Sequence, residues 1–203
     1  MTGPLFTLPG RRYSGFIFDC DGTLADTMPL HQRAWAHALR KHGATFDFSW
    51  ALFMSRAGKT TELTVHELNE QFGLRLDPLL VAADQRAHFD VVAPGVLALH
   101  SVVAFAREQA AAGLPVSVAS GGDVLTVRRT LATIGVADLF PVVVTAEDVK
   151  HGKPAPDLFL LAAQRMGVEP SDCLVFEDSL LGIEAASRAG MGSVLVASRD
   201  PAA

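Results

Sequence analysis

The chain has little cysteine, no excess of positive charge and no long apolar run. Its 203 residues include two cysteines, Cys20 and Cys173, which is too few for a disulfide framework or a zinc site. Seventeen lysines and arginines face 22 acidic residues, and the resulting net charge of −5 argues against binding to a nucleic-acid backbone. No apolar run is long enough to span a membrane, and residues 1–12 lack the basic-then-apolar pattern of a secretory signal. We therefore expect a cytoplasmic protein with reduced thiols and neither nucleic-acid nor membrane partners.

What is present is the composition of a well-packed globular protein, with 49% hydrophobic and 19% charged residues. Short apolar segments alternate with helical patterns from Leu114 onward. We expect strands at 15–19, 115–119, 142–145, 173–177 and 193–197, and helices at 96–112, 123–134, 156–167 and 180–189. This alternation predicts an α/β fold, a Rossmann-like parallel sheet covered by helices on both faces.

Residues 29–92 break the alternation. They contain helical patterns at Leu30–His42, Thr60–Phe72 and Pro78–Val92, a shorter apolar piece at Phe46–Met54, and no convincing strand. We therefore expect a core formed by residues 1–28 and 93–203, with a helical cap inserted at 29–92.

Two carboxylates follow the first expected strand, in the sequence Asp19-Cys20-Asp21-Gly22-Thr23. Side chains on a strand alternate between faces, so Asp19 and Asp21 project one way and Cys20 the other. Adjacent carboxylates repel each other unless a cation or a proton lies between them. The carboxyl ends of strands are also where open α/β sheets bind ligands. The pair alone is compatible with a solvated loop, and its partners along the chain make a ligand site the better interpretation.

Three further polar elements stand at comparable places. Ser120 and Gly121 follow the second strand, Lys153 precedes Pro154 at the expected start of a helix, and Glu177-Asp178 end the fourth strand. Each has a simpler interpretation: a turn serine, a surface lysine, or acids that cap the next helix. A helix amino terminus disfavours a cation, which favours a functional role for the lysine.

The order Asp-x-Asp-Gly-Thr, Ser, Lys-Pro, Glu-Asp resembles the haloacid dehalogenase-like hydrolase superfamily. Three segments, 31–35, 149–157 and 159–168, are similar to its β-phosphoglucomutase-like branch. The similarity is greatest to the bacterial fructose-1-phosphate and 6-phosphogluconate phosphatase-type members. The resemblance spans nearly the whole chain.

The resemblance implies a phosphatase that acts through an aspartyl-phosphate. Asp19 is the expected nucleophile, and Asp21 the group that protonates the leaving alkoxide and then deprotonates water. Lys153, Ser120 and the Gly121 amide would hold the phosphoryl group, and Gly22 and Thr23 would shape the loop. Mg²⁺ is the expected cofactor, held by Asp19, the backbone carbonyl of Asp21 and Asp178, with Glu177 behind these ligands or bound through water. His31 and Trp35, four residues apart on one helix face, are candidate substrate-binding residues.

The resemblance also indicates alternatives. The mutases of this branch use a cap arginine to hold a second phosphate, and a threonine occupies that place in Ser55–Glu62. Arg56 and Lys59 could substitute, although we expect them to be exposed, solvated cations. Hydrolysis of a small sugar phosphate is therefore the leading hypothesis and a phosphomutase the second. A non-catalytic phosphometabolite-binding protein is third, and Asp21 argues against a dehalogenase. We expect a small phosphorylated metabolite as the partner and a monomer or weak dimer.

Overall fold

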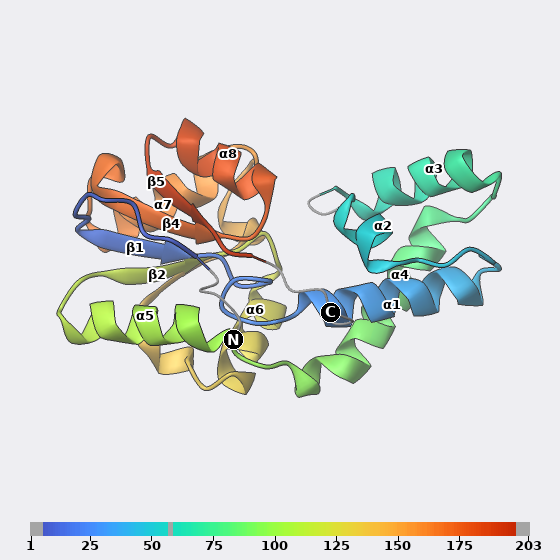
Figure 1. The fold of residues 1–203 in the computed structure, drawn as a ribbon, viewed down its shortest axis with the longest axis horizontal. Coiled ribbons are helices and arrows are strands. Elements are labelled where there is room, and N and C mark those ends of the chain that lie inside the picture. Colours follow the sequence, from blue (N-terminus) through green and yellow to red (C-terminus); the bar gives the residue numbers. More distant parts are fainter. Residues whose placement is uncertain (1–5, 57–58, 198–203) are drawn as a thin grey trace. The chain divides into compact units, whose positions relative to one another are not determined.

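The structure, a computed structural model, describes residues 6–56 and 59–197, which divide into two compact units. Of these residues, one unit contains 6–26 and 96–197, and the other contains those of Thr27–Gly95 (Figure 1). The chain therefore leaves the first unit after the loop that follows its first strand and returns before its second strand.

A five-stranded parallel sheet forms the centre of the first unit (Figure 1). Its strands are β1 Gly15–Phe18, β2 Val116–Ala119, β3 Val142–Val144, β4 Cys173–Glu177 and β5 Gly192–Leu195. They lie in the order β3-β2-β1-β4-β5, with Phe16 of β1 opposite Val116 of β2 and Leu174 of β4. The connections run from β1 toward β2 on one side and later return to β4 on the other. The carboxyl ends of β1 and β4 therefore flank the topological switch point, where such sheets bind ligands.

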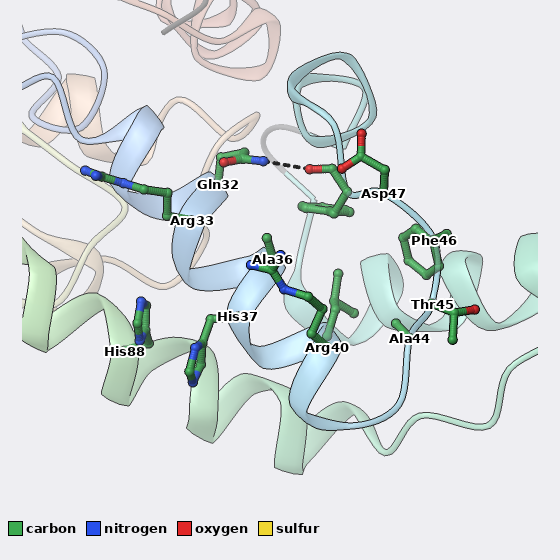
Figure 2. Close-up of a pocket in the computed structure, with 12 residues that line it drawn as sticks. Gln32, Arg33, Ala36, His37, Arg40, Ala44, Thr45, Phe46, Asp47 and His88 are labelled. Atoms are coloured by element: carbon green, nitrogen blue, oxygen red, sulfur yellow. Dashed lines mark hydrogen bonds between the residues drawn. The ribbon is translucent and has the colours of Figure 1, made fainter. Parts of the chain in front are cut away.

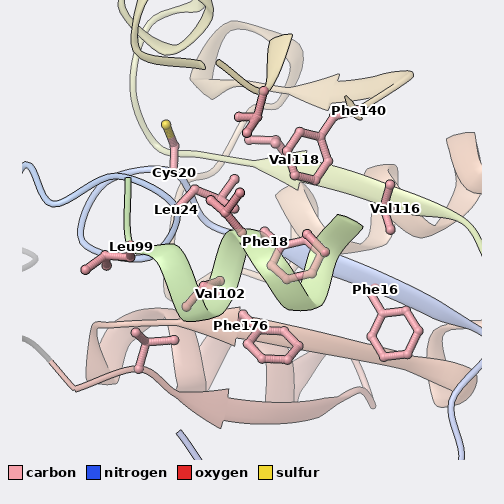
Figure 3. Close-up of a cluster of buried hydrophobic side chains, with 14 of the residues drawn as sticks. Phe16, Phe18, Cys20, Leu24, Leu99, Val102, Val116, Val118, Phe140 and Phe176 are labelled. Atoms are coloured by element: carbon pink, nitrogen blue, oxygen red, sulfur yellow. The ribbon is translucent and has the colours of Figure 1, made fainter. Parts of the chain in front are cut away.

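Helices cover both faces of this sheet. One face packs against α5 His100–Ala111 and α6 Val124–Thr133, and the other against α7 Asp157–Met166 and α8 Leu180–Arg188. The side-chain alternation of β1 produces this division. Phe16 and Phe18 join the cluster on the first face (Figure 3), whereas Ile17 packs with the α7 and α8 residues. The expected doubly covered parallel sheet is confirmed.

Single 3-10 turns occur in the connections. They are η1 Ala93–Gly95, η2 Ala137–Leu139, η3 Ala146–Asp148 and η4 Pro170–Asp172.

The helix expected at 96–112 begins four residues later, at His100. The preceding backbone pairs with the loop after β1 instead: the Leu99 amide donates to the Leu24 carbonyl, and the Asp26 amide donates to the Leu97 carbonyl. These hydrogen bonds hold the segment extended, so its apolar residues cannot enter a helix. The prediction was wrong there because a long-range pairing overrides a local pattern.

The second unit contains only helices and loops among its described residues. The helices are α1 Met28–Lys41, α2 Trp50–Met54, α3 Thr61–Phe72 and α4 Pro78–Val92, which surround their own buried apolar cluster. Thr60 and Asp77 cap α3 and α4 with side-chain oxygens, and Gly73 ends α3 at a φ of 65°. In the part of the chain that the structure describes, no helix is both long enough and apolar enough to cross a bilayer.

Candidate active site

The loop after β1 buries Asp19 and turns sharply behind it. Asp19 is 5% exposed, and Cys20 is fully buried in the apolar cluster that faces α5 and α6 (Figure 3). Gly22 has a φ of 79°, a conformation that side chains with a Cβ rarely adopt, and its amide donates to the Ala25 carbonyl. The buried Thr23 hydroxyl has no hydrogen-bond partner among the described residues, so this loop presents an unsatisfied polar group.

Lys153 joins the ends of β1 and β4. Its Nζ donates to Asp19 Oδ1 at 2.6 Å and to Glu177 Oε2 at 2.9 Å. The Lys153, Asp19 and Glu177 side chains are 13%, 7% and 2% exposed, so all three charges lie away from bulk water. Burial alone would lower the pKa of Lys153, but the two carboxylates raise it above its ordinary value. The lysine is therefore a fixed cation against Asp19.

Lys153 does not open a helix, contrary to the expectation from sequence. Helix α7 begins at Asp157, and Pro154 and Pro156 stand between them. A residue that precedes proline is disfavoured in the helical conformation, which accounts for the delay. The Lys153 ammonium also lies 5.1 Å from the ring centre of Phe159, a cation–π distance that further fixes its position.

Glu177 is held from the other side by the first turn of α8. Its Oε1 accepts hydrogen bonds from the Ser179 hydroxyl and from the Ser179 amide, and the same hydroxyl accepts from the Gly182 amide at 3.0 Å. A Cβ at Gly182 would lie 2.1 Å from Glu177 Cδ, so only glycine leaves room for this side chain.

Ser179 therefore caps α8, and the alternative in which Glu177 and Asp178 cap it is wrong. Sequence reasoning missed Ser179 and Gly182 as supporting residues. The signal was available, because serine before a helical segment is a preferred N-cap.

Three carboxylates converge at this place. One oxygen each from Asp19, Glu177 and Asp178 can be chosen so that all lie within 4.8 Å of one another. Burial and the neighbouring Glu177 charge raise the pKa of Asp19 well above its usual range and that of Asp178 to about 7. The single positive charge of Lys153 cannot balance the negative charge of three carboxylates. A hard divalent cation such as Mg²⁺ prefers oxygen ligands, so these residues fit it.

Ser120 and Asp21 stand near the same backbone segment. Ser120 is buried, and its Oγ accepts from the Gly122 amide at 3.1 Å, which leaves its hydrogen able to serve an acceptor. A Cβ built on Gly122 would lie 3.4 Å from Ser120 Oγ and 3.8 Å from Asp21 Oδ2. The Ser120 hydroxyl and the Asp21 carboxyl group therefore both lie next to Gly122. The neighbouring Gly121 is exposed, as a backbone donor to a ligand must be.

His31 and Trp35 line one cavity of the Thr27–Gly95 unit. Its volume is about 250 Å³, and its polar lining comes from Arg56, Lys59 and Thr64. The His31 ring stacks on Phe89 with 4.1 Å between ring centres. The two candidate substrate residues therefore line the same cavity as the cations Arg56 and Lys59.

The expectation that both cap cations are solvated is wrong for Arg56. Its side chain is 11% exposed and contacts Glu67 at 3.9 Å, and it donates to Gln71. Lys59 donates to both Glu67 oxygens, at 2.6 and 2.8 Å, and its side chain is 34% exposed. The glutamate thus fixes both cations beside the cavity.

Fold and site together describe an α/β protein with a cluster of three carboxylates at its switch point, whose oxygens fit a divalent cation. Residues 13–190 match the family model described as haloacid dehalogenase-like hydrolase. The chain is 39% identical over 189 residues to fructose-1-phosphate phosphatase YqaB of Escherichia coli, covering 91% of this chain and 96% of that one. It is 32% identical to hexitol phosphatase A of the same organism, covering 91% and 83%.

A solved structure of a putative β-phosphoglucomutase from Thermotoga maritima matches with a TM-score of 0.70 and 25% identity, covering 88% of this chain and 82% of that one. The chain belongs to the haloacid dehalogenase-like hydrolase family.

Proposed function

We propose that this protein is a Mg²⁺-dependent phosphatase that hydrolyses a small sugar phosphate or similar phosphomonoester through an aspartyl-phosphate. The observation that carries the proposal is the buried Asp19 carboxylate, which lies against Lys153 within a cluster of two further acids. Relatives named as fructose-1-phosphate and hexitol phosphatases support the substrate class.

In the proposed first step, an Asp19 oxygen attacks phosphorus and the bond to the sugar oxygen breaks. The Asp21 carboxyl gives its proton to the departing alkoxide, so a neutral alcohol leaves. Asp21 then takes a proton from water, the water oxygen attacks phosphorus, and the acyl-phosphate bond breaks to regenerate the Asp19 carboxylate. Two easier displacements thus replace one difficult one.

The other polar groups act on the phosphoryl oxygens. Lys153 supplies a fixed positive charge, and the Ser120 hydroxyl and the Gly121 amide supply donors, so charge that develops in the transition state meets preorganised partners. Asp19, the Asp21 carbonyl and Asp178 would hold Mg²⁺, with Glu177 behind these ligands or bound through water. The bound ion would offset the repulsion between a carboxylate nucleophile and a phosphate dianion.

We further propose that His31 and Trp35 contribute to the choice of substrate, because the cavity they share offers both stacking and charged groups. A second candidate function, isomerisation by a phosphomutase, is favoured by one observation. Arg56 is held almost buried beside this cavity, as a cation that binds a second phosphate would be. The threonine that replaces the expected mutase arginine makes hydrolysis the better supported reaction.

The test is phosphate release from fructose 1-phosphate, 6-phosphogluconate, β-glucose 1-phosphate and p-nitrophenyl phosphate, with and without Mg²⁺. The Asp19→Asn variant serves as the control for contaminating phosphatase. We expect release that requires both the metal and Asp19 and that favours a sugar phosphate over the aryl ester. Conversion of glucose 1-phosphate to glucose 6-phosphate with catalytic bisphosphate, without net hydrolysis, would instead establish the mutase.

A further inference from the structure

One groove of the Thr27–Gly95 unit has no part in the proposed reaction. Its volume is about 740 Å³, and it lies between α1, the 44–48 loop and His88 of α4 (Figure 2). It shares only Phe48 with the cavity that His31 and Trp35 line. None of the proposed nucleophile, acid–base or phosphoryl-binding residues belongs to this unit.

Two arginines and a histidine lie along the α1 side of this groove. Arg33, His37 and Arg40 occupy positions i, i+4 and i+7 of α1, so they share one face of the helix, and all three are exposed. In the described part of the chain, neither Arg33 nor Arg40 pairs with a carboxylate, and Asp47 is the one acid in the lining. Lys41, at the end of α1, is already paired with Asp84, which also contacts His42.

Two histidines lie beside these arginines in the groove lining. His37 of α1 and His88 of α4 face each other ring to ring, with 4.0 Å between centres and 9° between planes (Figure 2). Partial burial lowers the pKa of His88, and His37 and Arg33 lower it further. The two rings offer hydrogen-bonding nitrogens in the groove lining beside Arg33.

We propose that this groove is a second, non-catalytic binding site for a small anion that carries a phosphate group. Guanidinium groups match phosphate oxygens in a bidentate way, and imidazoles add hydrogen-bond donors. The volume falls in the range of small-molecule sites and is too small for a folded partner. Arg33 and Arg40 pair with no carboxylate in the described part of the chain, so both charges are available to an anion.

The test is a titration of the full chain with inorganic phosphate, followed by NMR of the histidine ring signals. The chain has seven histidines, and the variants His37→Gln and His88→Gln assign the two relevant signals. Because the readout is local to the groove, phosphate bound elsewhere does not enter it. A second titration with fructose 1-phosphate in the absence of Mg²⁺ distinguishes an esterified phosphate from the free ion.

We expect saturable shifts of both signals with at least one of these probes. The Arg33→Gln/Arg40→Gln variant loses two exposed ion pairs with the anion and should weaken binding about tenfold. Arg75→Gln removes an exposed cation from the same unit, outside the groove, and should leave affinity within about twofold. Shifts that chloride reproduces at equal ionic strength, or equal losses in both arginine variants, would overturn the proposal.

Discussion

The ammonium nitrogen of Lys153 lies 2.6 Å from Oδ1 of Asp19, although the residues are 134 positions apart in the chain. The parallel sheet brings them together, because the loops after its strands all open at the same edge. The same ammonium contacts Glu177, so one cation orients two of the three clustered acids.

Replacing this cation should affect catalysis more than ground-state binding. We expect Lys153→Met, which keeps much of the side-chain length, to lower kcat by about 10²-fold or more, because a charge aimed at the phosphoryl oxygens is lost. Steady-state kinetics measures this, with thermal unfolding to show that the variant is folded. Lys150→Met, at an exposed lysine of the same loop, is the matched control. A Lys153→Met enzyme within a few-fold of the wild-type rate would exclude the assigned role.

Removing the hydroxyl of Ser179 should loosen Glu177 and weaken metal binding. The hydroxyl donates to Glu177 Oε1 and also caps α8. The experiment must therefore separate the loss of the Glu177 contact from the loss of the helix cap. We expect Ser179→Gly, which costs a helix cap only a few tenths of a kcal/mol, to lower Mg²⁺ affinity measured by calorimetry. Ser179→Thr should restore it.

The control for cap loss alone is Ser49→Ala, at the hydroxyl that caps α2 in the other unit. That variant should lose stability without losing Mg²⁺ affinity. If Ser179→Gly binds the metal as well as the wild type does, the hydroxyl is only a cap.

Adding one methyl group at Gly182 should be damaging. Alanine normally stabilises a helix over glycine by about 1 kcal/mol, but a Cβ here would lie 2.1 Å from Glu177 Cδ. We expect Gly182→Ala to be destabilised by about 1–3 kcal/mol in urea unfolding and to lose Mg²⁺ affinity. Gly10→Ala, where no atom lies within 4 Å of the new Cβ, should change neither. A stabilised Gly182→Ala variant with unchanged metal affinity would contradict the packing argument.

Asp148 should make the stability of the fold depend on acid pH. The Thr145 amide and then the Arg165 guanidinium hold the pKa of this carboxyl below its usual 3.8. A folded-state pKa below the unfolded value stabilises the protein fully above the unfolded value, and this stabilisation is lost as the pH falls through the folded value.

Asp148→Asn should therefore cost about 1 kcal/mol at pH 7, and the difference should shrink as the pH falls below about 4. Urea unfolding across this pH range measures it. Asp138→Asn, at an acid without an ion pair in the described chain, should show no such trend. A difference that stays constant with pH would mean that the Asp148 charge is not the cause.

Some features of this structure can be predicted from the local sequence, and others depend on contacts between distant residues. The continuous apolar run Phe16–Phe18 predicts a strand that is buried on both faces, and its side chains do pack into the two clusters on either side of the sheet. The start of α5 was not predictable from local pattern, because a backbone pairing with Leu24 sets it. Likewise, contacts with Glu67 and Gln71 of α3 nearly bury Arg56. No local signal in the sequence specifies these contacts.

The most direct test of the central claim is to trap the phosphorylated Asp19. In a rapid-quench experiment, enzyme with Mg²⁺ is mixed with a substrate from the panel that carries a radioactive phosphate, and then precipitated in acid. We predict protein-bound label that forms within one turnover, is released by hydroxylamine as expected for an acyl phosphate, and is absent in Asp19→Asn. Full turnover without bound label, or label that persists in Asp19→Asn, would contradict the account.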